Sequence, residues 1–221
     1  KEKLEPFNIQ QVHDLPGVGE NLRDHPDYVS TYTSVNPETF GLSLKGTWHL
    51  SKQLLKFSNK REGLFTSNFA ETGGFLKTDS SLSTPDVQFH FVVAAVRDHA
   101  RDWKTSLRHG YSCHTCVLRP KSTGSLSLNS ADPLAAPIID PNFLAEQEDL
   151  EILKKGVRLA SSILEHNIMS KHKLRSLDKE FDMNDQQLEA HVREKTDSVY
   201  HPVGTCKMGH SEDSLAVVDN K

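Results

Sequence analysis

Apolar residues in the second half of the chain recur at helical spacing. Within "EQEDLEILKKGVRLASSILEH", residues 146–166, the apolar positions are separated by three or four residues: Leu150, Leu153, Val157, Ala160 and Leu164. Such spacing places them on one face of a helix. The acids of Glu146–Glu151 lie in the first turns, where the helix dipole favours negative charge. The pattern predicts an amphipathic helix whose acidic start is solvated and is not a cation site.

A second helix is predicted over "NDQQLEAHVREK", residues 184–195. Asn184 is a candidate N-cap, and Gln187 stands at the reciprocal position of a capping box. The helix is expected to end before Ser198, so "SVYHPVGTCKMGHSED", residues 198–213, lies in a loop. Another helix is predicted near Thr47–Phe57.

Three segments alternate or cluster apolar and β-branched residues as strands do: residues 85–96, 110–118 and 124–130. No long helix separates them, so they predict an antiparallel sheet and an α+β fold with flanking helices. Nearer the amino terminus, residues 9–13 favour a short strand. Glu20–Asp24 favours the start of a helix that Pro26 would stop.

Composition and charge fit a globular protein and argue against nucleic acid as a partner and against a membrane-spanning segment. The 221 residues are 36% hydrophobic and 25% charged, with a net charge of −4. Lys and Arg are scattered, which does not suit nucleic-acid binding. The longest apolar run, Phe89–Val96, is broken by His90 and is far shorter than the roughly 18 residues that a bilayer requires. No transmembrane segment is therefore expected.

The three cysteines, Cys113, Cys116 and Cys206, are an odd number and do not indicate a disulfide framework. The "CHTC" stretch has the C-x-x-C spacing of some zinc sites, and His109 and His114 are nearby. In a strand, however, residues three apart point to opposite faces. Packed strand cysteines are therefore favoured over a zinc site, and no metal is expected.

His201 is the main candidate for chemistry. Pro202 disfavours the α region for His201, and Gly204 lets another group approach the backbone closely. Imidazole can act as a base near neutral pH, although a histidine without a catalytic role is the alternative. His90, between Phe89 and Phe91, either faces a substrate cavity or is a hydrogen-bonded structural histidine, and the second reading is favoured.

Two stretches of the sequence carry a family resemblance: "YHPVGTCKMG" followed by "AVVD", and "DLPGVGENLRDHP" nearer the amino terminus. The first looks like the carboxyl-terminal signature of the glucose-methanol-choline family of flavin oxidoreductases, and the second is similar to another segment typical of that family. The strands and the acidic helix between them resemble the bacterial alcohol and choline dehydrogenase branch. The resemblance covers nearly the whole chain in the right order.

The resemblance implies a substrate domain built on an antiparallel sheet, together with segments of a Rossmann-like FAD-binding domain. Residues 1–28 would end a flavin-domain segment, residues 29–198 would form the substrate domain, and residues 199–221 would begin the return to the flavin domain. The chain has no G-x-G-x-x-G turn. The absence of an initiator Met suggests an internal piece, expected to be inactive by itself because the fingerprint and a second catalytic polar residue lie elsewhere.

For function, the resemblance implies oxidation of a primary alcohol to an aldehyde, with hydride transfer to FAD and His201 as proton acceptor. Tyr200 would line the flavin edge or simply pack. Electrons would pass to a quinone or another carrier, as in a dehydrogenase and not an oxidase. The alternatives are choline dehydrogenase proper or a non-catalytic module of the flavin family. The expected location is cytoplasmic or peripheral to a membrane.

Overall fold

The computed structural model describes residues 3–221, apart from the side chain of His99, and its contacts divide the chain into two compact units. The first unit comprises residues 1–26, 119–149 and 198–221, and the second comprises residues 27–118 and 150–197. The chain therefore enters and leaves the second unit twice. The predicted division differs from this one mainly at residues 119–149, which cluster with the terminal segments.

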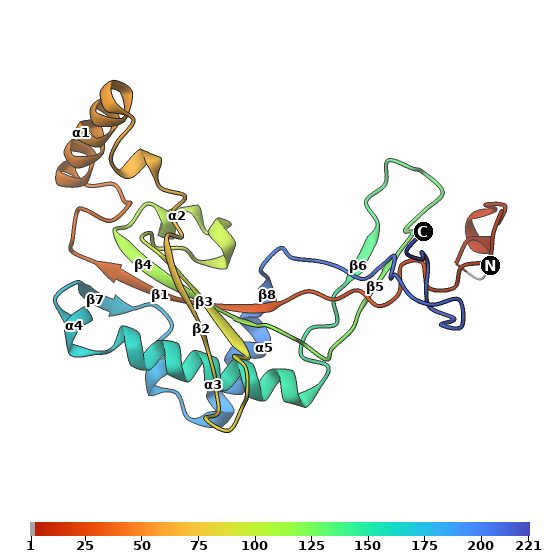
Figure 1. Cartoon of the computed structure of the whole chain (residues 1–221). Helices are drawn as coiled ribbons and strands as arrows, with labels where there is room; N and C mark the ends of the chain where they lie inside the picture. The colour runs from red at the N-terminus through yellow and green to blue at the C-terminus, as the bar shows by residue number, and fades with distance from the viewer. Residues whose placement is uncertain (1–2) are drawn as a thin grey trace. The chain divides into compact units, whose positions relative to one another are not determined.

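The second unit is built on an open antiparallel sheet (Figure 1). In spatial order its strands are β2 (Thr72–Leu76), β3 (Val87–Val92), β4 (Gly110–Val117), β1 (Pro26–Ser34) and β7 (Lys173–Ser176). A two-residue strand at the unit boundary, β8 (Asp197–Ser198), also pairs with β1. The strands predicted over residues 85–96 and 110–118 are β3 and β4, which pair antiparallel. The predicted α+β class is confirmed.

Helix α3 (Gln147–Leu164) covers one face of this sheet with the apolar stripe read from the sequence. Its five apolar stripe residues are at most 1% exposed: Leu150, Leu153, Val157, Ala160 and Leu164. The end of the stripe joins a core cluster with Tyr32, Phe89 and Tyr111 of the strands. A Cβ at Gly156 would lie 2.8 Å from Thr115 Cγ2, so glycine allows the close approach of helix and sheet.

The remaining helices are also specified locally. Helix α5 (Asp185–Lys195) has the predicted capping box, in which Asn184 and Gln187 each bond the other's backbone amide. Helix α1 (Leu44–Lys60) contains the segment predicted as helical and is capped by Ser43. The shorter helices are α2 (Trp103–Ser106) and α4 (Asn167–Ser170), with 3₁₀ turns at Glu5–Phe7, Leu64–Thr66, Asp98–Ala100 and Glu180–Asp182.

Three predictions for the first unit are wrong. Residues 9–13 are irregular and not a strand, and Glu20–Asp24 is extended and not helical. In the latter segment Asn21 has a left-handed φ of 57°, and Leu22 and Arg23 form single antiparallel bridges with distant residues. The third predicted strand, β5 (Ser125–Ser127), pairs with β6 (Ile138–Asp140) in a separate hairpin and does not join the main sheet.

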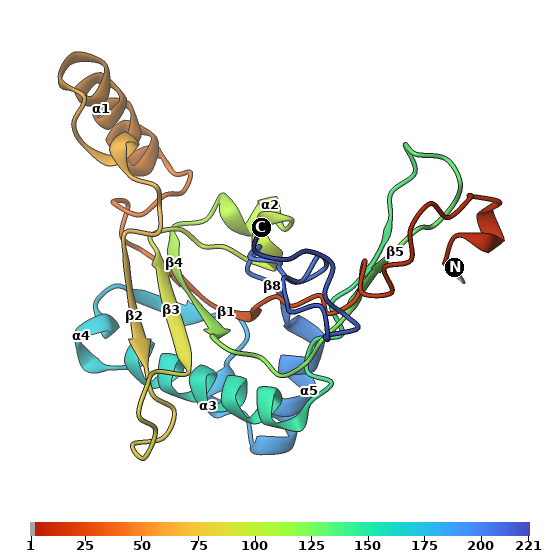
Figure 2. The same cartoon turned by 45° about the vertical axis from the view of Figure 1, so that its right-hand side comes forward.

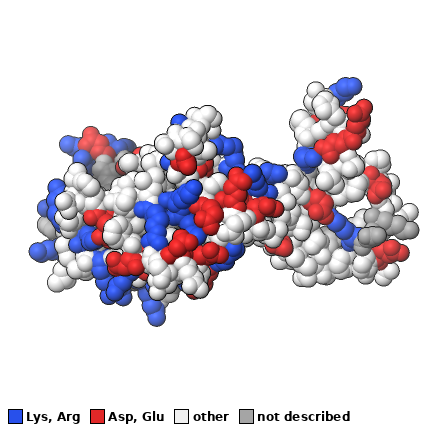
Figure 3. All heavy atoms as spheres, turned by 90° about the horizontal axis from the view of Figure 1, so that it is seen from below, with Lys and Arg blue, Asp and Glu red and all other residues white. Residues whose placement is uncertain are grey.

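Charged side chains of both signs are intermixed on the face that α3 and α5 present (Figure 3). Lys154 of α3 is itself buried, and its ammonium lies 3.2 Å from Glu151 Oε1 and 2.8 Å from Asp185 Oδ2. One predicted solvated acid is not exposed: Asp149 is fully buried, and its carboxylate accepts hydrogen bonds from Lys121 N and from Ser122 N and Oγ. Among the helices of residues 3–221, none has the length and apolarity to cross a membrane.

Candidate active site

Asp24 is the centre of a hydrogen-bond network in the first unit that holds the loop of His201. Asp24 is buried, with 8% of the residue exposed. Oδ1 accepts hydrogen bonds from the backbone amides of His25, at 2.8 Å, and His201, at 3.0 Å, and Oδ2 accepts one from Ser198 Oγ. Hydrogen bonds to a buried carboxylate are stronger than those between neutral groups. One side chain therefore fixes the backbone of two segments that are far apart in sequence.

Backbone pairing adds to this network on the carboxyl-terminal side of His201. Arg23 and Val203 exchange hydrogen bonds of 2.9 and 2.8 Å between their amides and carbonyls. Next to this bridge, Gly204 has a φ of +97°, and a Cβ there would collide with the carbonyl oxygen of Asn21. Glycine is required at this position because other residues rarely adopt such a φ and because the space is already filled.

Tyr200 precedes His201 in a strained conformation. Its φ of +68° is in the left-handed region, which costs a residue with a Cβ about 1–2 kcal/mol. Its amide donates to Ser198 Oγ at 2.7 Å, and the residue is 66% exposed. His201 is exposed as well. The two residues predicted from the sequence therefore stand next to each other on an accessible loop whose backbone is held in place.

A second imidazole lies beside His201. The His25 and His201 rings meet edge to face, with centroids 5.6 Å apart and planes at 88°. Burial, and then the neighbouring His201, lower the pKa of His25, while Asp24 acts in the opposite direction. Among the described residues, none gives the buried Nδ1 of His25 a hydrogen-bond partner. His25 is therefore neutral at neutral pH and adds no positive charge next to His201.

Asp24 and His25 were not singled out by sequence reasoning. Both lie in the "DLPGVGENLRDHP" segment that carries part of the family resemblance. The available signal was the histidine followed by proline in both "DHP" and "YHP". Nothing in the sequence pairs the two histidines, because the contact depends on the bridge between Arg23 and Val203.

The same geometry tests whether the expected FAD fits. An exposed Tyr200 ring beside an exposed imidazole offers surface to a planar aromatic ring. The glycines of the "PGVG" turn do not offer a phosphate cradle, because a Cβ at Gly17 or Gly19 would strike the backbone carbonyls of Leu215 and Leu126. The residues present fit the flavin ring and do not fit its pyrophosphate.

Comparison with known proteins identifies the family. Residues 120–221 match the family model described as GMC oxidoreductase. Over 98% of its length the chain is 37% identical to "Alcohol dehydrogenase [acceptor]" of Pseudomonas putida, and over its whole length it is 33% identical to "Oxygen-dependent choline dehydrogenase" of Cronobacter sakazakii. The chain belongs to the GMC oxidoreductase family. It spans 39% of the length of each of these two relatives.

Solved structures agree on the fold of this GMC chain. A solved structure of a formate oxidase from Aspergillus oryzae superposes with a TM-score of 0.78. The alignment covers 93% of this chain and 40% of the formate oxidase, with 21% sequence identity. At this identity the likeness supports the arrangement of sheet and helices and does not by itself assign a substrate.

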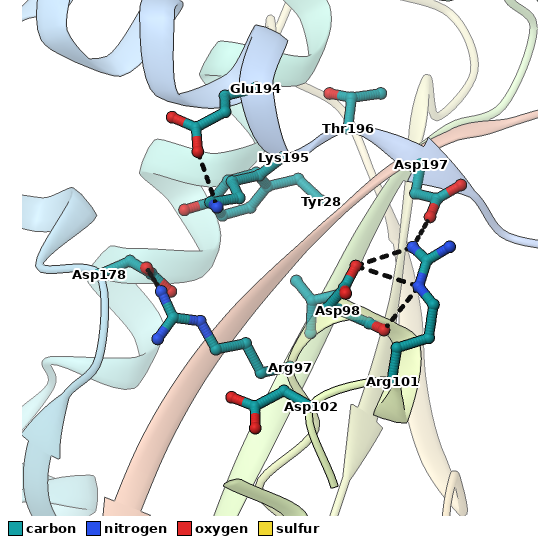
Figure 4. A pocket seen from close by; sticks show the side chains of 11 residues that line it. Tyr28, Arg97, Asp98, Arg101, Asp102, Asp178, Glu194, Lys195, Thr196 and Asp197 are labelled. Carbon is teal, nitrogen blue, oxygen red and sulfur yellow. Dashed lines mark hydrogen bonds and ion pairs between the residues drawn. The ribbon is translucent and has the colours of Figure 1, made fainter. Parts of the chain in front are cut away.

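The GMC chain also has a charged pocket of about 370 Å³ within its second unit (Figure 4). Its cations point at acids: Arg97 lies 2.8 Å from Asp178, and Arg101 contacts both Asp98 and Asp197. None of the residues that line it is a predicted site residue. These ion pairs connect the segment of residues 97–102 to the stretch between β7 and α5 and to β8. The pocket is therefore interpreted as a structural feature of the second unit.

Two histidines lie side by side on the strands of the second unit. His90 of β3 is opposite His114 of β4, and His114 Nδ1 is 2.6 Å from Oδ2 of the fully buried Asp27 on β1. The Asp27–His114 hydrogen bond ties the two central strands together. The favoured reading of His90 as a structural histidine stays a prediction.

The cysteines of "CHTC" pack as strand residues. Cys113 belongs to the core cluster beneath α3, and burial raises the pKa of its thiol to about 12. A thiol that is protonated at neutral pH is a poor metal ligand. Cys116 is fully buried three residues further along β4, where alternation turns its side chain to the other face. The interpretation as packed cysteines is confirmed.

Proposed function

We propose that the complete protein is an FAD-dependent oxidoreductase that oxidises a primary alcohol to an aldehyde, with His201 as the proton acceptor. The activity is proposed for the complete protein because the chain spans about two fifths of its relatives. The names of these relatives, an alcohol dehydrogenase and a choline dehydrogenase, support a CH–OH donor as substrate. A quinone or another carrier would then receive the electrons from the reduced flavin.

In this proposal, residues of this chain accept the proton of the substrate hydroxyl and hold the accepting base in place. When bound, FAD accepts the hydride that leaves the carbinol carbon. The imidazole of His201 takes the hydroxyl proton, which makes the departure of hydride easier. Asp24 holds the His201 backbone. His25 stays neutral next to the base, so the positive charge that His201 acquires meets no second imidazolium.

Tyr200 is proposed to cover the flavin edge, because its ring is exposed beside His201. The first unit would belong to the flavin side of the protein and the second unit to the substrate domain. The observation that carries the proposal is the anchoring of an exposed imidazole through its backbone to one buried carboxylate. Such pre-positioning is what a catalytic base needs.

The test replaces His201 by Ala in the complete protein. Bound flavin is measured by visible absorbance, and turnover is measured with primary aliphatic alcohols, aryl alcohols and choline, using a dye as acceptor. We expect flavin to be retained and kcat to fall by about 10²–10⁴, the range for a positioned base. His210→Ala, an exposed histidine in the same segment, is the matched control and should keep wild-type kcat.

Three results would reject parts of the proposal. Wild-type turnover in flavin-loaded His201→Ala would remove His201 from the chemistry. A wild-type protein that purifies colourless and free of flavin would favour the non-catalytic module. Turnover of choline alone within the substrate panel would replace the general alcohol assignment by choline dehydrogenase.

A further inference from the structure

Helix α1 of the second unit presents an uncovered apolar stripe. Leu44, Trp48 and Leu55 are 95%, 66% and 64% exposed. At 3.6 residues per turn they fall within about 40° of one another around the helix. Figures 1 and 2 both show α1 standing out from the sheet of its own unit. Large apolar side chains gathered on one exposed helix face mark an interaction surface.

The opposite side of α1 is already used for packing. Ser43 Oγ accepts the amide of Gly46 at 3.0 Å and lies 2.8 Å from Nε2 of His109, and Gly46 is buried against that ring. Further along, Gln53 Oε1 accepts the amide of Leu64 at 3.1 Å. The inner face of α1 therefore holds the helix against its unit. The outer stripe is not needed for that packing.

Positive charge accompanies the stripe. Four lysines lie along α1, and the sequence has no acidic residue from Leu44 to Arg61. Three of the lysines flank the stripe on one side: Lys45, Lys52 and Lys56. Lys52 Nζ lies 4.9 Å above the Trp48 ring, which joins the charged and apolar parts of the surface. The nearest acid on the chain, Glu62, is 3.5 Å from Lys56 and exposed.

We propose that α1 attaches the protein to an anionic lipid bilayer, lying in the plane of its surface. Trp and Leu side chains suit the boundary between headgroups and acyl chains, and lysines beside them reach the phosphates. Anionic headgroups complement the four lysines. A second copy of this chain in a two-fold contact would bring lysine against lysine, so self-association through α1 is disfavoured.

The apolar side chains of the stripe add to the electrostatic attraction. Leu44, Trp48 and Leu55 would leave water when α1 lies on a bilayer, and the burial of such area strengthens attachment.

The test is flotation of the complete protein with vesicles of phosphatidylcholine alone or with about 30 mol % phosphatidylglycerol. We expect binding to the anionic vesicles, weak binding to the neutral ones, and release at high salt, because salt screens the lysines. The assay needs neither flavin nor turnover. It can therefore fail while the proposed oxidoreductase function holds, and the reverse is also possible.

Variants separate the two parts of the surface. The triple change Lys45→Gln, Lys52→Gln and Lys56→Gln is expected to lower the partition coefficient on anionic vesicles by about 10²-fold. The triple change Leu44→Ser, Trp48→Ser and Leu55→Ser should lower it by at least about tenfold. The control with the same charge change, Lys155→Gln, Lys171→Gln and Lys179→Gln, alters exposed lysines elsewhere and should bind as wild type.

Three outcomes would overturn the proposal. The first is a wild-type protein that stays unbound from anionic vesicles. The second is equal loss of binding in the α1 lysine variant and the control, which would show a general charge effect. The third is a wild-type dimer, seen by light scattering, that the serine variant dissociates while vesicles do not bind, which would make a second copy the occupant. Thermal unfolding of each variant checks that it is folded.

Discussion

The backbone amide of His201 donates a hydrogen bond to Oδ1 of Asp24, 177 positions earlier in the chain. The same carboxylate oxygen accepts the amide of His25, whose ring meets that of His201 edge to face. One buried acid thus sets the positions of two imidazoles. The proposed base depends on a residue that takes no part in proton transfer itself.

Asp24→Ala is therefore expected to lower alcohol turnover of the complete protein without removing the base. Loss of charge-assisted hydrogen bonds of about 1.5–3 kcal/mol would reduce kcat by about 10- to 100-fold. KM should change less, because Asp24 positions His201 and does not hold substrate. Asp24→Asn should lie between wild type and Asp24→Ala, since an amide keeps an acceptor oxygen but loses the charge.

Steady-state kinetics with a dye acceptor would measure these effects at matched flavin content. Asp132→Asn, an exposed acid elsewhere in the first unit, is the control and should behave as wild type. If Asp24→Ala keeps wild-type kcat with flavin bound, the anchoring role is wrong.

His25 should make stability depend on pH. Burial and His201 lower the pKa of His25 below its ordinary value of 6.5. The unfolded chain then binds a proton more readily than the folded protein, so this contribution to stability is complete above pH 6.5 and is lost as the pH falls through the lowered pKa. His25→Gln should flatten that dependence.

Urea unfolding between about pH 5 and pH 7.5 measures the pH dependence of the unfolding free energy, with His210→Gln as control. An unchanged pH slope in His25→Gln would contradict the effect.

Gly204→Ala is expected to disturb the loop of His201. At a φ of +97° a side chain is strained, and the new Cβ would collide with the Asn21 carbonyl oxygen. We expect a loss of at least about 1 kcal/mol in unfolding free energy, together with a loss of turnover. Gly74→Ala is the matched control, because its Cβ would meet only Leu76 Cδ1 at 3.4 Å. Equal stability of the two variants would show that the loop tolerates a side chain at residue 204.

The helices were predictable because their signals are local. The stripe of α3 repeats every three or four residues, and the capping box of α5 lies within four consecutive positions. The family resemblance pointed to His201 through a short motif. Such features require no knowledge of which distant segments meet.

Features that depend on distant partners were missed or misread. Glu20–Asp24 favoured a helix by local composition, but its backbone groups bond Gly124 and Val203 instead. Strand β1 was not predicted because its sequence, "PDYVSTYTS", is polar on both faces although nearly all of it is buried. Some of its polar side chains find partners only in distant segments, as when Thr31 Oγ1 donates to the Val96 carbonyl.

Glu180→Gln is expected to stabilise the protein at neutral pH. Glu180 is fully buried, and burial raises the pKa of its carboxyl above the ordinary value of 4.5. The folded protein therefore holds this proton more tightly than the unfolded chain, so stability is greatest below pH 4.5 and falls as the pH rises through the raised pKa. A neutral amide avoids the cost of burying the charge and can still accept the hydrogen bond from Ser176 Oγ, which is 3.1 Å from Oε2.

The unfolding free energy of Glu180→Gln at pH 7 should rise by about 1 kcal/mol, and its pH dependence above pH 4.5 should flatten. Glu212→Gln, which changes an exposed acid, should leave both unchanged. Destabilisation by Glu180→Gln at every pH would mean that the buried carboxylate is ionised and held by its partners.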